Sequence, residues 1–215
     1  MGTSEAERRK LILEAAKRLL CHYGPHKTTI AEIAREADIG VGSVYLEFAS
    51  KEAIIGELSE LEHAGILEAM QDAAAKKKAR DASFADQIAA VVDARVEMFL
   101  QRGTDGAHTK DLLHCVNPSV KDAHTRFEES ERALIARLLR EGNDAGELET
   151  AEADETAAAI LRIYAAFAPP KVFLEPANEV RRMLRAVHEI VKFGVTRRGK
   201  RRRSAALPQP TFNRR

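Results

Sequence analysis

Residues 27–52 read KTTIAEIAREADIGVGSVYLEFASKE and contain the signals of two short helices joined by a tight turn, with a third helix starting directly afterwards. Thr29 and Glu32 have the spacing of a capping box, in which a hydroxyl and a carboxylate each accept from a backbone amide at the helix start. Thr28 is an alternative cap. Apolar residues then recur at the spacing of one helix face, at Ile30, Ile33, Ala34 and Ala37.

The segment 38–40, Asp-Ile-Gly, interrupts this apolar face, and Gly40 offers the backbone freedom that a tight turn requires. Residues 41–48 predict the second helix. The small residues Gly42 and Ser43 at its N-terminal end would let it come close to base edges and phosphates. The pattern predicts a helix-turn-helix whose second helix lies in the major groove of DNA.

About residues 8–58 resemble the DNA-binding domain of the TetR family of transcriptional regulators. The resemblance is carried by Gly24, Thr28, Ile33-Ala34, Ala37-Asp38-Ile39, Gly42-Ser43-Val44-Tyr45, Phe48 and Ser50-Lys51-Glu52. The ending Tyr-x-x-Phe-x-x-Lys-Glu makes it specific. It implies an all-helical homodimer that binds double-stranded DNA, with a C-terminal domain that binds a small-molecule effector.

The resemblance also implies the DNA contacts. Phosphates are expected to meet Thr28, Thr29, Tyr45 and Lys51, and base edges are expected to meet Val41, Gly42, Ser43 and Leu46. The apolar side chains of Val41 and Leu46 suit thymine methyl groups. The first prediction is therefore a transcriptional regulator that acts as a repressor. It binds a palindromic operator as a homodimer, and an unknown small-molecule effector releases it.

The charge of the head favours an alternative. The first fifty residues contain seven basic and seven acidic side chains, and Glu47 lies in the second helix of the motif. Phosphate neutralisation supplies much of the affinity for DNA, so a neutral head binds DNA less readily. The alternative is a helical dimeric protein-interaction module with a degenerate helix-turn-helix and no specific DNA binding.

The composition fits a soluble globular protein: of 215 residues, 45% are hydrophobic and 31% are charged. No apolar run approaches the roughly 20 residues of a membrane span, and the polar N-terminus is unlike a signal peptide. Cys21 and Cys115 are expected to stay reduced, which predicts a cytoplasmic protein without membrane partners.

Helical periodicity continues along the chain and predicts an all-α fold of about nine helices. The expected domains are a DNA-binding head at 1–50, an effector-binding and dimerisation domain at 51–198, and a flexible basic tail at 199–215 that either contacts DNA or only aids solubility. A long helix at 50–77 joins head and body and is the candidate for transmitting effector binding. Its expected inner face is Ile54, Leu58, Leu61, Gly65 and Ala69.

Further helices are expected at 4–23, 83–103, 112–116, 117–142, 153–168 and 178–196. The last two have wide apolar faces and are the predicted dimer interface, through Ala157, Ile160, Leu161, Val180, Leu184, Val187 and Val191. Candidate effector-pocket residues, chosen from the middle helices, are Met98, Phe99, Leu113, His114, Phe127, Tyr164 and Phe167.

Catalysis and metal binding find no support in the sequence. No nucleophile elbow, phosphate loop or paired-carboxylate motif is present. His108, His114 and His124 are spaced by six and ten residues, unlike the i, i+4 pairs of a metal site on one helix. We therefore expect no metal, no cofactor and no enzymatic activity.

Overall fold

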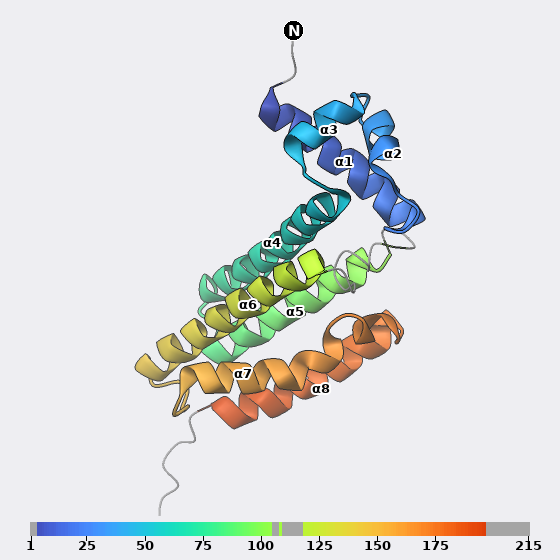
Figure 1. Ribbon diagram of the computed structural model, residues 1–215. Coiled ribbons are helices and arrows are strands. Elements are labelled where there is room, and N and C mark those ends of the chain that lie inside the picture. Colours follow the sequence, from blue (N-terminus) through green and yellow to red (C-terminus); the bar gives the residue numbers. More distant parts are fainter. Residues whose placement is uncertain (1–3, 105–107, 109–117, 197–215) are drawn as a thin grey trace, which may run out of the picture.

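The computed structural model describes residues 4–104, 108 and 118–196, and within them the protein is all-α, as predicted (Figure 1). The described helices are α1 (Glu5–Tyr23), α2 (Ile30–Glu36), α3 (Val41–Glu47), α4 (Lys51–Lys78), α5 (Phe84–Arg102), α6 (Pro118–Asp144), α7 (Ala153–Ile163), the 3-10 helices η2 (Tyr164–Phe167) and η3 (Lys171–Phe173), and α8 (Ala177–Val195). The helix expected at 112–116 and the tail at 199–215 lie outside the described residues.

The head consists of α1, α2 and α3 packed on the start of α4 (Figure 1). Its capping box forms as expected: Thr29 Oγ1 accepts from the amide of Glu32 at 3.2 Å, and Glu32 Oε2 accepts from the amide of Thr29 at 2.8 Å. The head core is closed by residues from α4 and α6. Its buried members are Ile12, Ala15, Ala16, Leu20, Ile33, Ala34, Ala37, Val44, Phe48, Ile54, Ile55, Leu58 and Val120.

The turn between α2 and α3 differs from the expectation in one residue. Asp38 has a φ of 54°, whereas Gly40 is extended, with a φ of −69°, and caps α3. Asparagine and aspartate tolerate the left-handed conformation better than other residues with a side chain, which explains why no glycine is needed at 38. The left-handed glycine of the head is Gly24, at the end of α1, with a φ of 81°.

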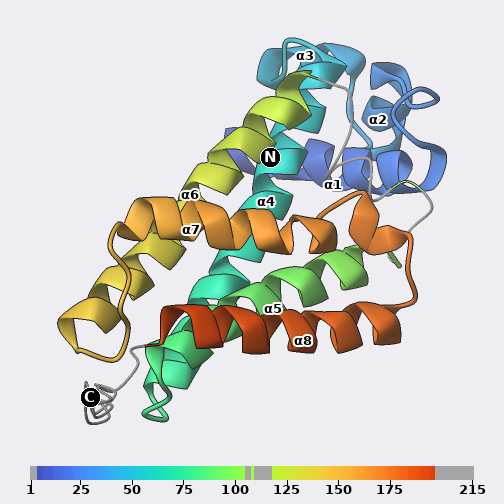
Figure 2. The same cartoon turned by 90° about the horizontal axis from the view of Figure 1, so that it is seen from below.

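The body stacks α4, α5 and α6 in one group and covers it with α7 and α8 on the side away from the head (Figure 1). Figure 2 shows α7 crossing α6 and α8 running beside α5, the helices with which they make contact. A second cluster of buried apolar residues extends through these helices, from Ile66 in α4 to Val195 in α8. The head and the body thus have separate cores joined by α4.

The inner face of α4 was predicted only in its first half. Ile54 and Leu58 are buried, but Leu61 is 54% exposed, and Gly65 and Ala69 are only half-buried. The buried face continues instead through Glu62, His63, Ile66, Met70 and Ala74. Two polar residues occupy this face because partners from other helices compensate their burial, which an apolar pattern does not reveal.

Candidate nucleic-acid interface and effector domain

Helix α3 presents the predicted DNA-reading residues on one exposed face. Val44 and Phe48 are buried and attach the helix to the head core. Val41, Gly42, Tyr45 and Leu46 are exposed, and Ser43 is half-buried. Leu46 is 77% exposed, and with the exposed Val41 and Tyr45 it makes this face of α3 largely apolar, as interaction sites are.

The expected phosphate contacts near α2 divide into two groups. Thr29 is exposed, but Thr28 is only 1% exposed and its hydroxyl donates to the carbonyl of Gly24 at 2.9 Å. The prediction of a side-chain phosphate contact by Thr28 is therefore corrected, because its hydroxyl is buried and already bonded. The ammonium group of Lys51 donates to the carbonyls of Pro25 and Thr28 at 2.7 and 3.0 Å, so it holds the chain before α2 against α4.

Glu47 does not lie on the reading face. Its side chain is 3% exposed and contacts Arg8 and Arg9 of α1. Arg9 also donates to the backbone carbonyl of Glu47 at 3.0 Å, and its guanidinium carbon lies 4.2 Å from the ring centroid of Phe48. The negative charge of Glu47 is thus neutralised inside the head, and it gives no support to the interaction-module alternative.

Head and body are joined by a buried carboxylate on α4. Glu62 is 5% exposed and pairs with Lys17 of α1 and with Arg102 of α5. Burial alone would raise the pKa of Glu62, but the hydrogen bond and charge of Lys17, together with Arg102, hold it below its usual value. A second contact joins the same regions, because the amide of His108 donates to the carbonyl of Cys21 at 3.1 Å.

The predicted effector-pocket residues lie mostly in the body core. Phe99, Tyr164 and Phe167 are buried, and Met98 packs against the same cluster. Phe127 lines a cavity of about 210 Å³ between α4 and α6, beside His63. Leu113 and His114 lie outside the described residues.

A cavity of about 300 Å³ has a floor that the sequence analysis did not identify. It lies between α6 and α7 and reaches Arg95 of α5 and Glu131 of α6. Their side chains are 7% and 2% exposed, and Arg95 Nε lies 3.0 Å from Glu131 Oε1. The sequence contains a pattern that could have identified Glu131 as buried. Glu131 is four residues after Phe127 and four before Ile135, so a charged residue interrupts an apolar helix face.

Opposing influences act on the pKa of Glu131. Burial raises the pKa of Glu131 to about 7, and the nearby charge of Glu128 adds to the effect, whereas Arg95 opposes it. The contact between the two side chains lacks hydrogen-bond geometry. Within the described part of the chain, Arg95 Nε, Arg95 Nη1 and Glu131 Oε1 are buried without a hydrogen-bond partner.

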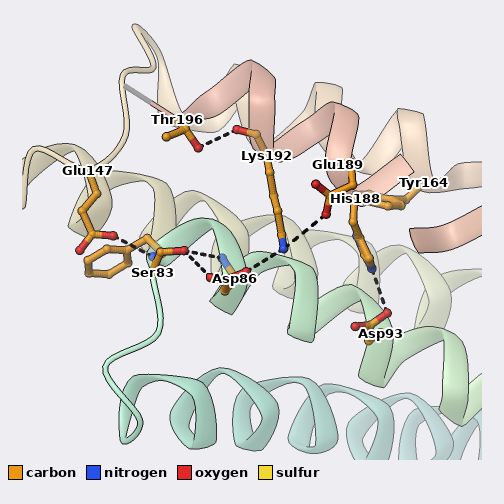
Figure 3. A network of polar contacts seen from close by, with 10 residues as sticks. Ser83, Asp86, Asp93, Glu147, Tyr164, His188, Glu189, Lys192 and Thr196 are labelled. Atoms are coloured by element: carbon orange, nitrogen blue, oxygen red, sulfur yellow. Dashed lines mark hydrogen bonds and ion pairs between the residues drawn. The ribbon is translucent and has the colours of Figure 1, made fainter. Parts of the chain in front are cut away.

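A polar network holds α8 against α5 (Figure 3). Tyr164 Oη and His188 Nδ1 are 2.6 Å apart, and His188 Nε2 lies 2.9 Å from Asp93 Oδ1. Lys192 Nζ pairs with Asp86 Oδ1 at 2.7 Å. Burial raises the pKa of the Tyr164 hydroxyl, so it stays protonated and can donate to His188.

The predicted dimer residues are directed inward for the most part. Ala157, Ile160, Val180, Leu184 and Val191 are buried in the core of their own protomer, and Leu161 and Val187 are half-buried. The outward side of these two helices carries other large apolar side chains. They are Ile163 on α7 and Met183, Ile190 and Phe193 on α8, and Phe193 is 70% exposed.

Comparisons with known proteins agree with this architecture. Residues 12–58 match the family of bacterial regulatory proteins called the tetR family. YhgD of Bacillus subtilis (strain 168), an uncharacterized HTH-type transcriptional regulator, is 23% identical over 160 residues, which are 74% of this chain and 82% of YhgD.

Two solved structures have the same fold. One is a putative TetR-family transcriptional regulator of Syntrophomonas wolfei, with a TM-score of 0.67, 19% identity and coverage of 89% of this chain and 97% of that chain. The other is the transcriptional regulator FadR of Bacillus subtilis in complex with stearoyl-CoA, with a TM-score of 0.64, 18% identity and coverage of 86% and 98%.

The helix-turn-helix head, its exposed second helix and the helical body define a transcriptional regulator of the helix-turn-helix class. Within the head, residues 12–58 match the TetR family of these regulators. None of the described helices has the length and apolar character needed to cross a membrane. The described residues also contain no group of His, Cys, Asp and Glu side chains arranged to hold a metal ion.

Proposed function

We propose that this protein binds a palindromic operator as a homodimer in the cytoplasm and represses transcription until a small-molecule effector releases it. The observation that carries the proposal is the exposed face of α3, where Val41, Tyr45 and Leu46 stand out from a helix that buried Val44 and Phe48 hold in place. A rigid helix with exposed side chains and a small N-terminal end suits the major groove.

The proposed contacts follow from this face. Val41, Gly42, Ser43 and Leu46 meet base edges, with the two apolar side chains against thymine methyl groups. Thr29, the N-cap of α2, and Tyr45 of α3 meet phosphates, because both side chains are exposed. Lys51 has one N–H left after its two carbonyl contacts, and its main role is to position α2.

The proposed dimer pairs α7 and α8 of one protomer with those of a second copy. The support is the outward apolar group of Met183, Ile190 and Phe193 on α8, which three- and seven-residue spacings place on one side of the helix. Exposed apolar patches of this kind mark interaction sites. Such a dimer would hold two α3 helices about 34 Å apart, one turn of DNA.

The effector would bind in the body, where the cavities beside Phe127 and Arg95 lie, and act on the head through α4. The structure of FadR from Bacillus subtilis holds stearoyl-CoA, a small molecule bound to a protein of the same fold. In this protein, Glu62 of α4 pairs with Lys17 of α1 and with Arg102 of α5. A shift of α5 would therefore move Glu62 and, through Lys17, the head. We propose residues 1–50, 51–198 and 199–215 as head, body and tail.

A gel shift with the DNA upstream of the protein's own coding sequence tests the proposal. Tyr45→Ala should weaken binding to all sequences alike, whereas Leu46→Ala should change the preference at one base position, because only base contacts carry sequence information. Leu61→Ala is the control, since Leu61 is an exposed leucine on α4, outside the reading face. No band with this DNA or with selected random DNA would favour the interaction-module alternative instead.

A further inference from the structure

The floor of the cavity between α6 and α7 is built from charge rather than from apolar side chains. Arg95 and Glu131 are buried there, while the walls come from Ala158 and Leu161 of α7 and from Ala168. Small side chains on this wall leave the space open. The exposed residues Glu128 and Arg132 lie at the rim.

The two floor residues leave hydrogen-bonding capacity unused. Arg95 Nε and Nη1 are donors, and Glu131 Oε1 is an acceptor, and none of the three has a hydrogen-bond partner within the described part of the chain. Buried polar groups without partners destabilise a fold, and each one in a native structure calls for an explanation. A ligand in this cavity could supply both the missing acceptor and the missing donor.

We infer that this cavity binds the effector through a neutral, planar polar group of the carboxamide type, in which an acceptor oxygen lies beside an N–H donor. The inference rests on the proposed function and names the chemical class of its effector. The oxygen of this carboxamide-type group accepts from Arg95, and its N–H donates to Glu131. The apolar part of the effector lies against Ala158, Leu161 and Ala168.

The charges of the floor residues disfavour a charged ligand group. The guanidinium of Arg95 and the carboxylate of Glu131 balance each other at 3.0 Å. At the floor of the cavity, a ligand anion would meet the carboxylate of Glu131, and a ligand cation would meet the guanidinium of Arg95. A neutral ligand group that both donates and accepts hydrogen bonds avoids both like-charge contacts.

Benzamide, a carboxamide on a small apolar ring, is the probe. We would titrate it into the isotope-labelled full-length protein and follow the backbone amide signals by NMR, with benzoate, benzylamine and toluene as matched probes. Benzamide should shift the signals around residues 95, 131, 158 and 161 and bind at least about tenfold more tightly than the other three, because only it satisfies both floor residues. Equal binding of the four probes, or none by benzamide, would overturn the inference.

Two variants test the site itself. The double substitution R95M/E131L removes both charges together, which buried ion pairs often tolerate without loss of stability, and should abolish benzamide binding. Ala158→Leu fills the cavity from its wall without touching the ion pair and should weaken binding at least about tenfold. Retained binding in either folded variant contradicts the site. The matched control E60Q/R126Q removes an exposed ion pair between α4 and α6 and should leave benzamide binding unchanged.

The proposed function is tested separately on the same samples. DNA binding by the wild-type protein without benzamide binding would refute only the effector class. Benzamide binding without any DNA band would refute the operator function and leave the cavity assignment standing.

Discussion

The Nε group of Arg8 donates to Glu47 Oε1 at 2.7 Å, so the last residue of α3 is directed toward α1 and away from the exposed reading face. The carboxylate serves as the acceptor that fixes α3 at its C-terminal end. An acidic residue in a DNA-reading helix therefore stabilises the helix without facing the phosphates.

Glu47→Gln should lower the free energy of unfolding by about 1–2 kcal/mol, because it weakens a charge-assisted contact to the partly exposed Arg8 and Arg9. Urea unfolding measures the change. Glu14→Gln is the control: its contact with Lys10 is exposed, and the change should stay within about 0.5 kcal/mol. A variant of unchanged stability but altered base preference would place Glu47 on the reading face after all.

Lys51→Met should weaken DNA binding to all sequences and lower the stability of the head by about 1–3 kcal/mol, since the ammonium no longer bonds the carbonyls of Pro25 and Thr28. The slope of log affinity against log salt should stay the same, because these partners are not phosphates. A slope reduced by about 1 would show that the third N–H of Lys51 meets a phosphate.

His63 should make the protein sensitive to acid. Burial, aided by the positive charge of a protonated His124, lowers the pKa of His63 to about 4. The folded state then binds fewer protons than the unfolded state between about pH 6.5 and 4, so stability is present above 6.5 and is lost as the pH falls, by at most about 3 kcal/mol. Urea unfolding at several pH values measures this loss.

The variant His63→Gln separates this effect from those of other groups. Glu131 acts in the opposite direction, because its raised pKa costs stability as the pH rises from about 4.5 to 7. Subtracting the curve of the variant from that of the wild type removes such shared contributions. A difference that does not change between pH 6.5 and 4 would show that His63 does not titrate in the buried site.

The outward face of α8 should control the oligomeric state. The wild-type protein should scatter light as a dimer of 23.8 kDa chains at micromolar concentration, and I190E/F193E should scatter as a monomer because charges replace the apolar contact. Leu174→Glu is the control, as Leu174 is an exposed apolar residue outside α8. A wild-type monomer at this concentration would refute the proposed dimer.

The sequence alone predicted the features that depend on neighbours a few residues away. The Thr29 cap, the apolar face of α2 and the exposed α3 follow from helical spacing and capping chemistry, which act over one or two turns. They were sufficient to recognise the head and the all-α class.

Only the tertiary structure decided where the charged and polar side chains point. Glu62 is buried because Lys17 and Arg102 approach it from 45 and 40 residues away, and Arg95 meets Glu131 from another helix. Glu47 turns to Arg8 of α1, 39 residues away, for the same reason. A charge or hydroxyl is stable inside a protein only where a partner meets it, and those partners come together only when distant helices pack.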